Sequence, residues 1–128
     1  MSDANIKTVR DAELEIASIV VERAMAGKDL WKSSDNAFYT IIGEDISASL
    51  EVDGRSVAKA ERWDLFTVQQ GEKTLVFYYY PTTYREATNQ NLAPAVIRGE
   101  IDKLFRHLLK RELDSTYGPA LERLRALK

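Results

Sequence analysis

The 128-residue sequence has no cysteine, one histidine and three prolines. The lack of cysteine excludes disulfide bonds and thiolate metal ligands, and it is typical of proteins from a reducing compartment. No apolar run approaches the ~20 residues of a membrane-spanning helix. The polar start of the chain lacks the apolar stretch of a secretory signal. We therefore expect a cytoplasmic protein.

The sequence also lacks an excess of charge of either sign, because the formal net charge is only −2. This balance argues against a general binder of polyanions. The chain from residue 98 onwards is weakly basic and the remainder is acidic. With 45% hydrophobic and 30% charged residues, the composition predicts a single folded domain over residues 1–128, with residues 1–7 as a disordered tail.

Motifs of catalysis and metal binding are absent as well. There is no nucleophile elbow, phosphate-binding loop, dinucleotide glycine fingerprint or HExxH sequence. The single histidine, His107, is predicted at the boundary between core and solvent on a helix, and no motif places a serine or an acid beside it. Glu44, Asp45 and Asp53 lack the spacing of a calcium loop and are predicted as turn residues. We expect no catalytic residue, no cofactor and no metal site.

The richest apolar and aromatic run lies within residues 73–80 and predicts a central β-strand that ends before Pro81. Alternation puts successive side chains on opposite faces of a sheet. We expect one set to face the helices, namely Leu75, Phe77 and Tyr79. We expect the other set to lie on an open, tyrosine-bearing face, namely Val76, Tyr78 and Tyr80.

The N-terminal segment predicts a helix that is capped by Thr8 with Asp11 and that ends at Gly27. Its apolar residues recur at helical spacing and form one stripe, namely Leu14, Ala17, Val20, Val21, Ala24 and Met25. Ile16 and Ile19 fall outside this stripe. A helix with a second apolar side packs either between two layers of its own domain or against another subunit.

The middle of the chain predicts a meander of strands over residues 38–42, 46–52, 55–63, 65–68 and 73–80. Residues 28–36 are predicted as a loop that Trp31 anchors to the domain. Asp53-Gly54 is a strong hairpin signal, since the central positions of a type I′ turn need positive φ. Residues 55–63 are also rich in helix formers, and we favour the strand because the turn fixes the direction of the chain.

The C-terminal region predicts a helix that starts near Pro94, is broken at Tyr117-Gly118-Pro119 and is followed by a short last helix. The first helix has a broad apolar face, formed by Ile97, Ile101, Leu104, Phe105 and Leu108. The last helix has one apolar side, formed by Leu121, Leu124 and Leu127. The order of elements predicts an α+β fold, in which an N-terminal helix and two C-terminal helices pack on one face of a four- to five-stranded antiparallel meander.

The absence of catalytic motifs and the open sheet face favour a protein-binding, adaptor or chaperone-like module that associates with itself as a homodimer. The residues we predict to contact another protein or a second copy are Val76, Tyr78, Tyr80, Ile16 and Ile19. Two alternatives stay open. One is single-stranded nucleic-acid binding through the basic residues Lys103, Arg106 and Lys110. The other is a small-ligand or enzyme site in a cavity near Tyr79, His107 or Trp63.

Overall fold

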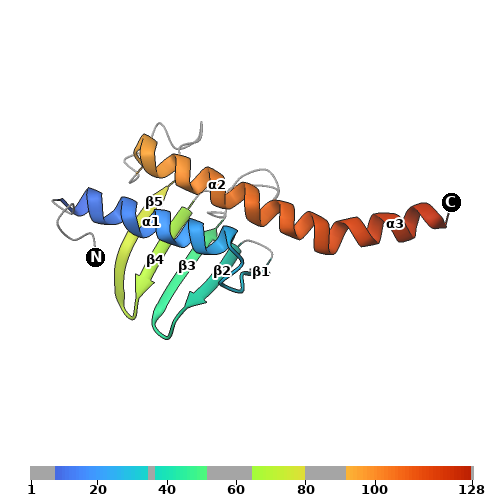
Figure 1. Cartoon of the computed structure of the whole chain (residues 1–128), viewed down its shortest axis with the longest axis horizontal. Helices are drawn as coiled ribbons and strands as arrows, with labels where there is room; N and C mark the ends of the chain where they lie inside the picture. The colour runs from blue at the N-terminus through green and yellow to red at the C-terminus, as the bar shows by residue number, and fades with distance from the viewer. Residues whose placement is uncertain (1–7, 35–36, 52–64, 80–91, 128) are drawn as a thin grey trace.

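The computed structural model describes residues 8–34, 37–51, 65–79 and 92–127. These residues form helix α1 (Val9–Met25), a five-stranded sheet and a C-terminal helical region (Figure 1). The strands are β1 (Lys32–Ser34), β2 (Ala37–Ile42), β3 (Ile46–Glu51), β4 (Leu65–Gln70) and β5 (Lys73–Tyr79). The helical region comprises α2 (Ala95–Glu112), a π-helical turn η3 (Leu113–Tyr117) and α3 (Gly118–Ala126). The predicted α+β fold with an antiparallel sheet is confirmed.

Helix α1 begins and ends where its local signals predict. The Thr8 hydroxyl oxygen accepts a hydrogen bond from the Asp11 amide at 3.0 Å, which caps the first turn. Gly27 has a positive φ of 73°, and the Lys28 amide donates to the Arg23 carbonyl at 2.9 Å. This arrangement is typical of a helix that ends on a left-handed glycine.

The strands pair in sequence order, and every neighbouring pair is antiparallel. Strand β5, which holds the richest apolar run, therefore lies at an edge of the sheet that the described strands form, and the prediction of a central strand is wrong. In a meander each hairpin sets the next strand beside the last, so position follows chain order and not apolar content. Residues 32–34, predicted as loop, form the short edge strand β1.

Two tight hairpin turns join the described strands. Gly43 and Gly71 adopt positive φ values of 66° and 59° in the β2–β3 and β4–β5 connections, a conformation that side-chain-bearing residues avoid. The predicted turn at Asp53-Gly54, the uncertain segment 55–63 and the predicted tail 1–7 lie outside the described residues.

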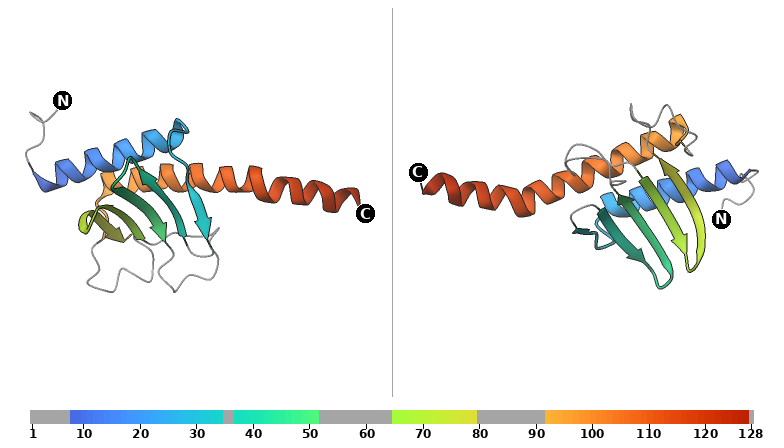
Figure 2. Two further views of the ribbon diagram at one scale, coloured as in Figure 1. Left: turned by 90° about the horizontal axis from the view of Figure 1, so that it is seen from below. Right: turned by 180° about the vertical axis from the view of Figure 1, so that it is seen from behind.

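The core lies between the sheet and the pair of helices α1 and α2, which run side by side over one face (Figure 2). Helix α2 buries the apolar face that the sequence predicts, with Phe105 partly buried and Ile97, Ile101, Leu104 and Leu108 buried. Phe66 and Leu50 are the largest fully buried side chains of the sheet. The opposite face of the sheet has no described helix over it (Figure 2).

The C-terminal helix continues beyond Glu112 without the predicted break. In η3 the Gly118 amide donates to the Leu113 carbonyl, five residues back. This wider turn accommodates Pro119, whose ring conflicts with the carbonyl four residues back in a regular helix. Helix α3 then projects away from the sheet (Figure 1) and has no buried residue. The expectation that this last helix packs on the sheet is wrong.

Candidate protein-interaction surfaces

The side chains of β5 face the opposite way from our prediction. Val76 and Tyr78 are 0% and 5% exposed and belong to the core, whereas Phe77 is 38% exposed. The cause is a β-bulge, because Val76 pairs with Val68 and Thr74 pairs with Gln69, which leaves Leu75 as an extra residue. Leu75 also packs against the core, so simple alternation counted from Leu75 assigns the later residues to the wrong faces.

The prediction that Val76 and Tyr78 lie on an open face is therefore wrong, and Tyr80 lies outside the described residues. The Tyr78 hydroxyl donates a hydrogen bond to the Glu13 carboxylate at 2.5 Å, which joins β5 to α1. Burial, and secondly this hydrogen bond, raise the pKa of Tyr78 above its ordinary value. In this structure Tyr78 connects a strand to a helix and does not face solvent.

The sheet face opposite the two helices, here called the open face, is aromatic at both sides. Tyr39 and Ile41 of β2 are 42% and 68% exposed. On β5 the Phe77 and Tyr79 rings meet edge to face, with their centroids 5.8 Å apart. Cross-strand pairing aligns Tyr39 with Phe77 in one row through small hydroxyl residues, namely Ser49 and Thr67. A tyrosine-bearing face was predicted, but with the wrong residues.

Ile16 and Ile19 line an apolar crevice between α1 and the turn end of the sheet. The other apolar side chains around this crevice are Val20, Ile42, Ile46, Val68 and Leu75, and its volume is about 160 Å³. Ile16 packs against the core, whereas Ile19 is 46% exposed. The second apolar side of α1 is thus accounted for largely within the domain. A role for Ile16 and Ile19 in partner binding stays a prediction.

The connection from α1 to β1 is held by polar contacts around a buried tryptophan. Arg23 donates from Nε and Nη2 to the two carboxylate oxygens of Asp29 at 2.9 and 2.7 Å, and this hydrogen bonding raises the pKa of Arg23. The Thr40 hydroxyl donates to the Leu30 carbonyl at 2.7 Å. Trp31 is buried, so its predicted role as an anchor of this loop is confirmed.

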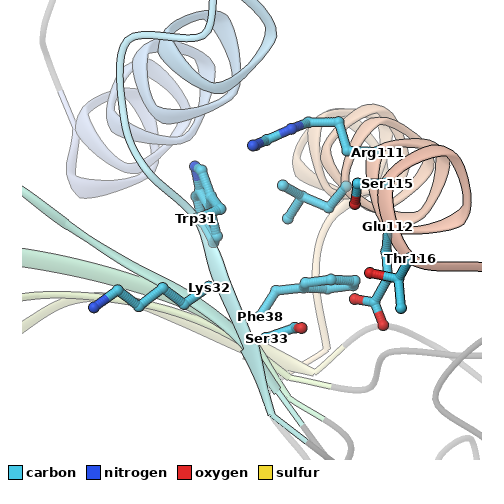
Figure 3. A pocket seen from close by; sticks show the side chains of 9 residues that line it. Trp31, Lys32, Ser33, Phe38, Arg111, Glu112, Ser115 and Thr116 are labelled. Carbon is cyan, nitrogen blue, oxygen red and sulfur yellow. The ribbon is translucent and has the colours of Figure 1, made fainter.

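A small pocket lies beside Trp31, where the sheet edge meets α2 and η3 (Figure 3). Phe38 faces it from the sheet, and Arg111 and Ser115 face it from the helix. The Trp31 indole nitrogen is buried and has no hydrogen-bond partner. The pocket volume of about 90 Å³ holds a few water molecules and is well below the ~300 Å³ at which ligand pockets begin.

The ligand or enzyme site predicted near Tyr79, His107 or Trp63 stays a prediction, because only part of its surroundings lies among the described residues. His107 is half-buried with an unpartnered Nε2, and neither His107 nor Tyr79 lines the crevice under α1 or the Trp31 pocket. Trp63 lies outside the described residues. Among the residues that the structure describes, no group of three or more His, Asp or Glu could hold a metal ion.

The predicted nucleic-acid residues lie along α2, where carboxylates accompany them. Lys103 donates to Glu100 at 3.2 Å, and Lys110 donates to Asp114 at 2.8 Å. The second hydrogen bond raises the pKa of Lys110. Arg106 is exposed on the same helix. The neighbouring carboxylates reduce the positive potential that phosphate binding requires, and nucleic-acid binding by these residues stays a prediction.

A second exposed apolar surface lies on the projecting helix, and the sequence did not mark it as an interaction surface. We call residues Leu113–Leu127 the C-terminal extension; none of its η3 or α3 residues is buried. Its apolar side chains are 45–81% exposed, namely Leu113, Tyr117, Leu121, Leu124 and Leu127. Their helical spacing was visible in the sequence, where it predicted packing on the sheet of the same chain.

Comparisons with protein-family models, curated proteins and solved structures gave no match. None of the described helices has the length and apolar character needed to span a membrane. The function must therefore be inferred from the two exposed apolar surfaces and their chemistry.

Proposed function

We propose that the protein is a small cytoplasmic protein-binding module, of adaptor or chaperone-like character and without catalytic activity, that associates with itself. The observation that carries this proposal is the open face, where Tyr39, Ile41 and Phe77 are exposed on one side of a sheet whose other side is covered by helices. Aromatic residues are enriched at protein interfaces, and apolar patches of this kind mark interaction sites.

The chemistry of the open face suits an apolar segment of another protein. Small hydroxyl side chains on β3 and β4 separate the aromatic residues at the two sides. One of them, Ser49, donates a hydrogen bond to Glu51 at 3.3 Å. A surface with aromatic margins and small polar residues between them receives large apolar side chains and offers hydrogen bonds to a polypeptide backbone.

Nucleic-acid binding has weaker support, because Lys103 and Lys110 are paired with carboxylates. A small-molecule site also has weaker support. The crevice under α1 and the pocket at Trp31 have volumes of about 160 and 90 Å³, which are below those of most ligand pockets. A third hollow, beside Leu121 on the C-terminal extension, has about 290 Å³ but is shallow and open to solvent.

Site-specific photocrosslinking in cells tests the open face directly. A photoreactive phenylalanine analogue replaces Ile41, and a matched variant carries it at Lys103, which is exposed on α2. We expect a protein that crosslinks at position 41 and not at position 103. The protein identified in this way is then purified and titrated calorimetrically against the wild type, Ile41→Lys and Lys103→Ala.

We expect Ile41→Lys to weaken this binding at least ~10-fold, because a charge is placed against an apolar partner surface. Lys103→Ala should bind as the wild type does. Equal crosslinking at both positions, or an affinity that Ile41→Lys leaves unchanged, contradicts the assignment of the open face as a protein-binding surface.

A further inference from the structure

The C-terminal extension has the form of a helix that lacks its partner. It projects away from the sheet and from α1 (Figure 1), and every apolar side chain along it is exposed. Isolated helical segments of this length are only marginally stable in water, and most helical stability in proteins comes from packing of an apolar side. The extension is therefore expected to gain stability from a second element along its apolar side.

The π-helical turn keeps that apolar side straight. Residues four apart in a regular α-helix are rotated by ~40° from one another, so a line from Leu109 through Leu113 and Tyr117 to Leu121 drifts by ~120°. The turn Leu113–Tyr117 contains one extra residue, which reduces the total drift to ~20–40°. Leu124 continues the line one turn later. The resulting stripe runs along the whole extension.

Charged residues beside the stripe indicate which occupant fits. Asp114, Glu122 and Arg125 lie on the same side of the extension, because all three line one shallow hollow with Gly118 and Leu121. In an antiparallel pair of identical helices, the same flank of each copy faces the other. Asp114 of one copy then meets Arg125 of the second copy, and the twofold axis repeats this contact. Glu122 is level with the uncharged residues 115–117 of the second copy.

The apolar residues give the same alignment. A register that sets Asp114 against Arg125 also sets Leu113 against Leu124 and Tyr117 against Leu121, within two residues in each case. A parallel pairing faces opposite flanks, so it does not bring Asp114 of one copy against Arg125 of the other. The apolar stripe and the charges thus agree on an antiparallel pair.

We propose that two copies of the chain pair through their C-terminal extensions, antiparallel and in the register Leu113 to Leu124. This proposal rests on the self-association stated under the proposed function and names its surface. The two sheets then lie at opposite ends of the paired helices, which leaves both open faces accessible. The paired segment is only about four helical turns long, so we expect a weak dimer with a micromolar Kd.

Cysteine crosslinking tests the register, because the chain has no cysteine of its own. The full-length variants Leu113→Cys and Leu124→Cys are oxidised separately and as a mixture. We expect a disulfide-linked dimer in the mixture only. In the proposed register the two positions 113 are separated by ~17 Å along the helix, and a disulfide needs Cα atoms within ~7 Å.

Charge reversal gives an independent readout of the same register. Asp114→Arg and Arg125→Asp should each raise the dimer Kd by about tenfold, since each creates two like-charge contacts. The double variant Asp114→Arg/Arg125→Asp should restore the wild-type Kd, because both contacts then have opposite charges again. Circular dichroism on each variant confirms that it is folded.

The outcomes separate this inference from the wider proposal. Disulfides within each single variant indicate a parallel pair and overturn the inference. A wild-type dimer that forms no 113–124 disulfide and is insensitive to charge reversal associates through another surface, so the inference falls while self-association stands. A wild type that is monomeric at all concentrations overturns both the helix pairing and the proposed self-association.

Discussion

The hydroxyl of Tyr78 on β5 donates a 2.5 Å hydrogen bond to the carboxylate of Glu13 on α1. The contact ties an edge strand of the sheet to the first helix across 65 residues of sequence. Glu13 also lies 4.0 Å from Arg10. The tyrosine that alternation assigned to an open recognition face is thus part of the packing between sheet and helix.

Removal of this hydroxyl should destabilise the fold. We expect Tyr78→Phe to lower the free energy of unfolding by about 1–2 kcal/mol, because Glu13 loses a donor in a partly buried site. Urea denaturation measures the loss. Tyr39→Phe is the control, since the Tyr39 side chain is 42% exposed on the open face, and it should change stability by less than ~0.5 kcal/mol.

The same contact predicts a dependence on alkaline pH. The pKa of Tyr78 is raised in the folded state, so the fold favours the protonated tyrosine, which titrates near ~10 when unfolded. Its contribution is complete below about pH 10 and is lost as the pH rises further. The stability difference between the wild type and Tyr78→Phe should therefore be constant up to about pH 9 and shrink as the pH rises above about 10. A constant difference contradicts this assignment.

Substitutions on the two faces of the sheet test which side chains face the core and which lie on the open face. Val68→Thr should cost about 1–3 kcal/mol, because Val68 is fully buried and the new hydroxyl lacks an assured partner. Ile41→Thr keeps a β-branched residue at an exposed position and should change stability by less than ~0.5 kcal/mol. Equal losses in thermal or urea denaturation are incompatible with an open face at Ile41.

Truncation within α2 should separate its buried and exposed positions. Leu104 is fully buried in the core, so Leu104→Ala should cost on the order of 2–5 kcal/mol through lost burial and the cavity that it leaves. Val96 lies on the same helix and is 55% exposed, and Val96→Ala should be nearly neutral. Denaturation curves with similar midpoints for both variants contradict the packing of α2 on the sheet.

Two glycines should respond to alanine in opposite directions. Neither Gly27 nor Gly99 has an atom within 4 Å of a new Cβ, so backbone conformation decides the effect. Gly27 has positive φ, and Gly27→Ala should cost ~1 kcal/mol. Gly99 lies within α2, and Gly99→Ala should stabilise by ~0.5–1 kcal/mol. Calorimetric melting of both variants checks the signs.

Local signals carried the parts of the fold that were predicted correctly. Thr8 and Gly27 terminate a helix through bonds to residues three to five positions away, and the apolar spacing of α2 repeats with the helix itself. Such features depend on neighbouring residues and are visible in a single sequence. The antiparallel meander followed in the same way from short strands separated by turn residues.

The errors arose where structure depends on distant residues. The bulge at Leu75 forms only against β4, and it reversed the assignment of Phe77 and Tyr78. The leucines of α3 have the same spacing whether they pack on their own sheet or on a second molecule. The spacing alone therefore identified the apolar side of α3 but not the surface on which that side packs. For this reason the C-terminal extension was not predicted as an interaction surface.

The molar mass in solution tests most directly the claim that the protein binds protein through surfaces that its own fold leaves uncovered. Light scattering is measured on the wild type, Leu124→Glu and Ala126→Glu at matched concentrations, with Ala126 as the exposed control on the opposite side of α3. We predict twice the 14.5 kDa chain mass for the wild type and Ala126→Glu at high concentration, and a monomer for Leu124→Glu. A monomeric wild type, or a Leu124→Glu variant that dimerises as the wild type does, contradicts the account.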